Sequence, residues 1–165
     1  CSLGQNVMIT NFQQYFKLVE YLSEFTKERM GLAMGVNNLI QIFDEKYYRH
    51  LSGGVLEAFG KLFYRDLKLY IYPYHNQASN EYINIENLKV HPRMKELYKF
   101  FKKNGRLVNI DDFDPEILDI FSRSVLKMIV NGDKGWEDML PEGIPEIIKQ
   151  KRLFGYSKTR KIKLT

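Results

Sequence analysis

The residues best suited to chemistry in this chain are two glycines at the expected start of a helix. Gly53 and Gly54 precede an amphipathic segment, where a glycine pair leaves backbone N–H groups free to face an anion. Arg49 lies just before the pair, and Lys61 lies further along the same segment. We expect Arg49, Gly53, Gly54 and Lys61 to hold a phosphate group. A tight turn with close packing is the alternative explanation of the glycines, because the phosphate-loop spacing G-x-x-x-x-G-K-[ST] is absent.

Polar residues also lie where two expected strands end. Asn37 and Asn38 follow the apolar run at 30–35, and Tyr72 ends the run at 67–72. Open parallel sheets bind ligands outside the carboxyl ends of their strands, so these residues are expected at one edge of the sheet. We expect Asn37, Asn38 and Tyr72 to orient a ligand. Capping of the following helix is the alternative role for the two asparagines.

Acidic residues favour structural roles over catalysis or metal binding. Glu57, in the first turns of the glycine-opened helix, suits the helix dipole and could instead act as a general base. Asp111, Asp112 and Asp114 could hold Mg²⁺, but Asp114 precedes a proline and is typical of a helix cap. The three histidines lack metal-ligand spacing, and the single cysteine has no partner. We expect no resident metal, with Mg²⁺ arriving only alongside a nucleotide.

Tyrosine is unusually frequent, with eleven residues, and six of them lie around the glycine-opened helix and the 67–72 run. Such rings can stack on a base or form a surface for a partner, and they can equally line a half-hydrated core. The six are Tyr47, Tyr48, Tyr64, Tyr70, Tyr72 and Tyr74.

The pattern of apolar residues predicts an α/β fold. Short apolar runs at 6–10, 30–35 and 67–72 predict strands, and helical spacing predicts helices from Asn11, from Asn37 or Asn38, and from the glycine pair. This order is typical of parallel βαβ units. The three runs show little polar alternation, as strands buried on both faces do. We therefore predict a small, mostly parallel sheet of about three strands flanked by helices.

The second half of the chain predicts a helical portion at 91–156. Residues 74–90 are polar and predict an internal loop or an edge hairpin. Pro92 and Pro115 open two amphipathic segments that Gly105 and Gly132 close, and the second is expected to bury Ile117 and Phe121. We predict one domain at 1–156, followed by a flexible basic tail at 157–165.

Charge and hydropathy narrow the possible partners. The net charge is +5, but four of the 25 basic residues lie in the tail and the remainder is nearly neutral, which argues against nucleic-acid binding. Apolar runs fall well short of the ~20 residues of a membrane helix, and no signal-peptide pattern is visible. We expect a soluble cytoplasmic protein that does not contact membranes.

Several segments resemble the C-terminal part of a family of larger, mainly bacterial proteins described as nicotinamide or nicotinate mononucleotide adenylyltransferases. The resemblance runs from about Val7 to Tyr156, and it implies a nucleotidyltransferase whose N-terminal region precedes this chain. Adenylyltransferase motifs of the forms H-x-G-H and I-S-S-T-x-x-R are absent here, so no catalytic residue is transferred. Either the chemistry lies upstream or the family name does not describe it. The segments are 7–11, 44–48, 53–63, 69–73 and 153–156.

Two functions follow as expectations. The first is a domain of a larger protein that binds a nucleotide or another phosphate-bearing ligand. The second is a non-catalytic interaction or oligomerisation module, including a homo-oligomer, that uses the tyrosine-rich face. A concave pocket with converging polar groups favours the first, whereas a flat apolar patch favours the second.

Overall fold

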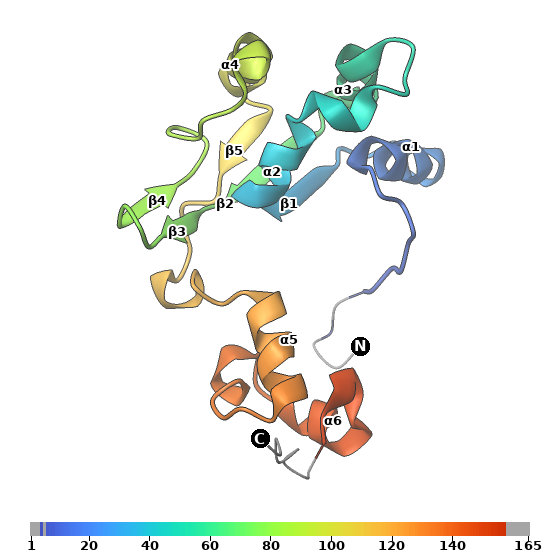
Figure 1. Ribbon diagram of the computed structural model, residues 1–165. Coiled ribbons are helices and arrows are strands. Elements are labelled where there is room, and N and C mark those ends of the chain that lie inside the picture. Colours follow the sequence, from blue (N-terminus) through green and yellow to red (C-terminus); the bar gives the residue numbers. More distant parts are fainter. Residues whose placement is uncertain (1–3, 5, 158–165) are drawn as a thin grey trace. The chain divides into compact units, whose positions relative to one another are not determined.

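The computed structural model describes residue 4 and residues 6–157, and the chain divides into two compact units at 1–113 and 114–165 (Figure 1). The single domain expected at 1–156 stays a prediction, and the expected basic tail lies outside the described residues apart from Ser157.

The first unit is built on a parallel sheet of three strands, which confirms the predicted α/β fold (Figure 1). The strands are β1 (Gly31–Gly35), β2 (Lys68–Tyr72) and β5 (Leu107–Asn109), in the order β1-β2-β5. β2 is the central strand, with Gly35 opposite Tyr72 and Asn109 opposite Ile71.

Four helices contribute to one apolar core with the sheet. They are α1 (Tyr15–Phe25), α2 (Val36–Ile42), α3 (Gly54–Leu62) and α4 (Lys95–Lys103). Leu69 and Ile71 of β2 are fully buried in this core, so the helices cover the face of the sheet to which these two side chains belong. Other buried core residues include Phe16, Val19, Leu39, Ile42, Phe59, Leu62, Tyr98, Phe101 and Leu107.

A hairpin follows β2, as one of the two alternatives for residues 74–90 expected, but it forms a two-stranded sheet of its own and not an edge of the parallel sheet. Strands β3 (Tyr74–Asn76) and β4 (Glu81–Ile83) pair antiparallel, with Tyr74 opposite Ile83.

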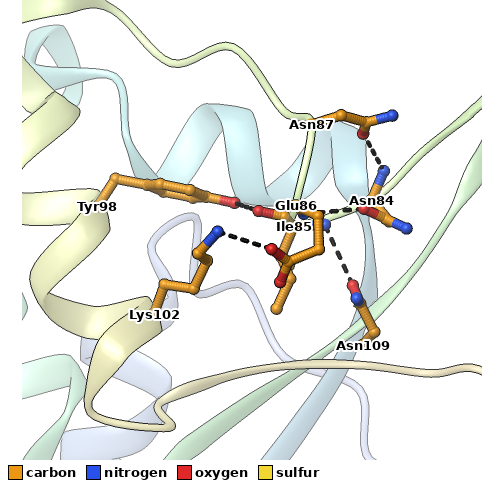
Figure 2. A network of polar contacts seen from close by, with 7 residues as sticks. All are labelled: Asn84, Ile85, Glu86, Asn87, Tyr98, Lys102 and Asn109. Carbon is orange, nitrogen blue, oxygen red and sulfur yellow. Dashed lines mark hydrogen bonds and ion pairs between the residues drawn. The ribbon is translucent and has the colours of Figure 1, made fainter.

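The segment after the hairpin is fastened to both α4 and β5 (Figure 2). Tyr98 Oη donates a hydrogen bond to the carbonyl oxygen of Ile85 at 2.8 Å, and the N–H of Ile85 donates to Asn109 Oδ1 at 3.1 Å. Lys102 Nζ lies 2.9 Å from Glu86 Oε2. Burial raises the pKa of Tyr98 above its ordinary value, so its hydroxyl stays protonated and able to donate. The network therefore ties α4 to β5.

The second unit contains helices α5 (Ser122–Asn131) and α6 (Ile144–Lys151) around a small core. Asp114 is a cap, as expected: its Oδ1 accepts a hydrogen bond from the Glu116 N–H at 2.9 Å. However, it caps a short 3-10 helix, and α5 begins only at Ser122. Ile117 and Phe121, expected inside, are 48% and 44% exposed. The buried core residues are Val125, Ile129, Trp136 and Ile148.

Three predictions about the first unit are wrong. The segment at 6–10 is not a strand: its apolar side chains, Val7, Met8 and Ile9, are exposed, and the third strand is instead β5, within the portion expected to be helical. Asn11 does not cap α1, which begins at Tyr15 after Gln14. β5 takes the free edge of β2 by two flanking hydrogen bonds, from Leu69 N–H to the Arg106 carbonyl and from Ile110 N–H to the Ile71 carbonyl.

Among the residues that the structure describes, no helix has the length and apolar character needed to cross a membrane.

Candidate ligand site

The glycine pair expected to bind phosphate already holds a carboxylate of the chain itself. The N–H of Gly53 donates a hydrogen bond to Glu57 Oε2 at 3.0 Å. Lys61 Nζ lies 3.1 Å from Glu57 Oε1 and 3.5 Å from Glu20 Oε1. The hydrogen bond from Gly53, followed by that from Lys61, lowers the pKa of Glu57, which therefore stays ionised at neutral pH. A phosphate could bind here only by displacing Glu57, and this role of Gly53, Gly54 and Lys61 stays a prediction.

Arg49 lies at a separate hollow of about 330 Å³, which acidic and basic side chains also line. Lys89 and His91 lie on it, as do Asp44 and Lys46, whose side chains form an ion pair with each other. The hollow therefore mixes both signs of charge.

The strand ends lie at one edge of the sheet, as expected. Gly35 and Tyr72 are register partners in parallel strands, so the chain leaves β1 and β2 on the same side. Gly35 is the N-cap residue of α2, so the capping alternative for Asn37 and Asn38 is wrong. Both asparagines lie in the first turn of α2. Their ligand-binding role and that of Tyr72 stay predictions.

A groove of about 800 Å³ lies at the opposite edge of the sheet, where the strands begin, between α3 and α4. Each helix contributes residues at positions i, i+3, i+4 and i+7, which is one face of a helix. From α3 and its end these are Leu56, Phe59, Gly60 and Phe63, and from α4 and its end Leu97, Phe100, Phe101 and Asn104.

The walls of the groove are apolar and partly bare. Leu56 is 68% exposed and Phe100 is 58% exposed. Phe63 and Phe101 are stacked, with ring centroids 4.0 Å apart. Gly60 lies within α3, and a Cβ added there would meet no atom within 4 Å. Because glycine costs about 1 kcal/mol relative to alanine within a helix, packing does not explain this residue, but an open groove does.

One end of the groove is cationic. Arg29 precedes β1, Lys68 begins β2 and Arg106 precedes β5, and all three line the groove. Arg106 is paired with Asp66, whereas neither Arg29 nor Lys68 forms an ion pair with any residue in the described part of the chain. An anion bound beside Arg29 and Lys68 would therefore not have to displace a carboxylate from either.

The backbone at this end adopts an uncommon conformation. Arg65 and Asp66 have φ values of +51° and +61°, the left-handed region that non-glycine residues seldom adopt. Arg65 Nη1 donates a hydrogen bond to the Thr26 carbonyl at 3.1 Å. Residues with strained backbone are often found at functional sites. Here the strained residues lie just before Lys68, and both Asp66 and Lys68 line the groove.

This groove was not predicted from the sequence, because ligand sites were expected at the carboxyl ends of the strands and at the glycine pair. Leu56, Phe59 and Phe63 indicated an apolar helix face, but periodicity does not separate a buried stripe from a groove wall. Gly60, in the middle of an otherwise regular helical pattern, was the available signal.

In the described residues, no group of three or more His, Cys, Asp or Glu side chains is placed to hold a metal ion.

Comparisons with known proteins returned no relative of this chain. No protein-family model matches it, no curated protein matches it, and no solved structure matches it. The resemblance to mononucleotide adenylyltransferases stays a prediction, and the site is interpreted from its own geometry.

Proposed function

We propose that this chain is a binding domain for a phosphate-bearing small molecule with an aromatic or apolar part, most simply a nucleotide. The observation that carries the proposal is the α3–α4 groove, whose apolar walls end at Arg29, Lys68 and Arg106. The groove therefore offers apolar contacts and cationic side chains within one cavity.

The size and chemistry of the groove suit such a ligand. Its volume, about 800 Å³, lies within the roughly 300–1,000 Å³ of small-molecule sites. The exposed ring of Phe100 offers a stacking surface to a base, and Leu56 closes the opposite wall. Arg29 can bind a phosphate with two parallel N–H groups, and Lys68 adds a point charge.

The groove supports this function better than the glycine pair does. At the glycine pair, Glu57 already accepts the hydrogen bond that a phosphate would accept, and Lys61 is paired with two acids. At the groove, Arg29 and Lys68 are available for a bound anion.

Nucleotidyl transfer, which the sequence resemblance implies, is a further part of this proposal. The groove would hold the nucleotide, and a Mg²⁺ ion carried by its phosphates would find the carboxylate of Asp66 nearby. An adenylyltransferase assay is justified once a nucleotide is shown to bind.

A calorimetric titration tests the proposal. The full chain is titrated with ATP, nicotinamide mononucleotide, nicotinate mononucleotide, NAD and inorganic phosphate, with and without Mg²⁺. We expect at least one nucleotide to bind, and we expect Gly60→Leu, which fills the groove, to abolish the binding. Binding that is equally tight in Gly60→Leu would place the ligand elsewhere, and no binding of any nucleotide would exclude this ligand class.

A further inference from the structure

One face of the parallel sheet carries no helix in the described part of the first unit. Along β2, Leu69 and Ile71 are fully buried beneath the helices, and the alternate residues belong to the other face. Parallel sheets are nearly always covered on both faces, so an uncovered one is unusual. The open face comprises Gly31, Ala33 and Gly35 of β1 and Lys68, Tyr70 and Tyr72 of β2, with Val108 of β5.

The open face is largely apolar, and at its far end the ring of Phe113 packs against Tyr72, with ring centroids 6.0 Å apart. β1 presents only glycine and alanine there, next to the two tyrosines of β2. A Cβ added to Gly31 would lie 2.7 Å from Cε2 of Tyr70, so the Tyr70 ring lies across β1 over the missing side chain. Tyr70 is nevertheless 38% exposed. The open face is therefore a platform on which the Tyr70 ring lies flat and does not protrude, and we call this surface the platform.

The dimensions of this platform match a single helix. Strands of five residues are about 17 Å long, and three strands span about 14 Å. A helix of about three turns has that length and a diameter of about 10 Å. A second copy packed face to face would cover much less than the roughly 800 Å² per partner typical of a stable dimer.

Charges at the two ends of the platform favour one direction of the helix. Lys68 lies at the end where the strands begin, while Asp111 and Asp112 follow β5 at the end where the strands finish. A helix dipole carries partial positive charge at its N-terminus and partial negative charge at its C-terminus. A helix antiparallel to the strands therefore places its N-terminus near the aspartates and its C-terminus near Lys68.

We propose that the open face is the docking site for one amphipathic helix of a partner protein, running antiparallel to the strands. Its apolar stripe lies on Ala33, Tyr70 and Tyr72, and acidic residues in its last turn face Lys68. The open face shares Gly31, Lys68 and Tyr70 with the lining of the α3–α4 groove, so the two proposed sites adjoin, but docking of a helix does not require that a nucleotide binds.

Two stapled helical peptides test the proposal by fluorescence anisotropy with the full chain. Both carry the same alanine and leucine stripe and have equal helicity. One has lysine in its first turn and glutamate in its last turn, and the other has these charges exchanged. We expect the first to bind about fivefold more tightly at low salt, because both of its ends complement the platform. Equal binding of the two peptides, or binding of neither, would overturn the proposal.

Three variants locate the binding. Ala33→Arg places a long charged side chain on the platform and should abolish peptide binding, whereas Gln13→Arg, at an exposed position before α1, should not. Lys68→Glu makes both ends of the platform acidic, so the two peptides should then bind with equal affinity. Binding that is retained but has lost its preference cannot result from general damage to the fold. Peptide binding that survives Ala33→Arg would overturn the proposal. So would a dimer of the free chain that Ala33→Arg dissociates, because a second copy would then occupy the face.

Discussion

Arg29 has a charge that is available to bind an anion in the groove. It lines the cationic end and forms no ion pair with any other residue in the described ranges. We expect Arg29→Gln to weaken binding of a phosphate-bearing ligand by about tenfold, since a hydrogen bond to a charged group contributes about 1.5–3 kcal/mol. Stability should not change. Calorimetry measures the affinity, with Lys127→Gln on α5 as the control, and equal affinity of both variants would contradict the assignment.

Tyr98 joins α4, which forms one wall of the groove, to the segment that follows the hairpin. Tyr98→Phe removes the hydroxyl that donates to the Ile85 carbonyl at 2.8 Å but keeps the ring, which packs 5.0 Å from that of Phe43. We expect the free energy of unfolding to fall by about 1–2 kcal/mol because the Ile85 carbonyl loses its partner. Urea denaturation measures this loss. An unchanged midpoint would show that the hydrogen bond does not stabilise the fold.

Glu57 makes the stability of the fold depend on pH in the acidic range. Its folded-state pKa is lowered by the Gly53 N–H and by Lys61, so it stabilises the fold fully above its unfolded-state pKa, near 4.5. This contribution is lost as the pH falls below 4.5 and through the lowered pKa. We expect Glu57→Gln to be less stable than wild type at pH 7 and to show a shallower loss on acidification. Melting temperatures measured from pH 7 to pH 3 provide the comparison, and parallel curves would refute it.

At the scale of elements, α3 contains a glycine that weakens it. Gly60→Ala should raise the free energy of unfolding by about 1 kcal/mol, because the added Cβ meets no atom within 4 Å and the residue has ordinary helical φ. Gly60→Leu should also favour the helix, yet its longer side chain should block the groove. Thermal denaturation of both variants shows whether loss of binding is separate from loss of stability. A destabilised Gly60→Ala would show that Gly60 serves the packing of α3.

Strands show where sequence patterns succeed and fail. β1 and β2 were predictable because each is a short apolar run between helical patterns. β5 has only three residues, too few for a period to be visible, and it lies just after a helix-closing glycine. The run at 6–10 had the composition of a strand, but composition does not show whether an edge of the sheet is available to it.

Tyrosine explains why the open face was not predicted. Counted as apolar, Tyr70 and Tyr72 make β2 a continuous apolar run that indicates burial on both faces. The structure shows strict alternation, with Leu69 and Ile71 buried and Tyr70 exposed, so the prediction of burial on both faces is wrong for β2. The amphipathic ring tolerates both environments, and only the fold reveals which one it has.

The candidate site was harder to predict from the sequence than the fold was, because more of it arises from tertiary packing. The edge shared by Gly35 and Tyr72 followed from parallel strands and was predictable. The hydrogen bond from the Gly53 N–H to Glu57 was not predictable, because a glutamate four residues further along a helix can equally well be an exposed acid without such a bond. The groove brings residues 29, 56–63, 68 and 97–106 together, and no local pattern in one segment indicates that meeting.

In the whole molecule, two surfaces of the first unit are proposed as binding sites: a groove with a cationic end for a phosphate-bearing ligand, and an open sheet face for a helix. The residues that define both surfaces lie within 1–113. We expect a chain ending at Phe113 to keep nucleotide affinity if it folds by itself, which circular dichroism would establish before calorimetry. Full folding with complete loss of affinity would show that the second unit contributes to the ligand site.

The central claim is that a nucleotide binds between α3 and α4, and hydrogen–deuterium exchange of the full chain with and without saturating nucleotide tests it most directly. We expect slower exchange at 54–63 and 95–106 and at the starts of β1 and β2, with little change at 36–38. Protection confined to 36–38, 49–54 and the residues after Tyr72 would contradict the claim, and would place the ligand at the carboxyl edge and the glycine pair.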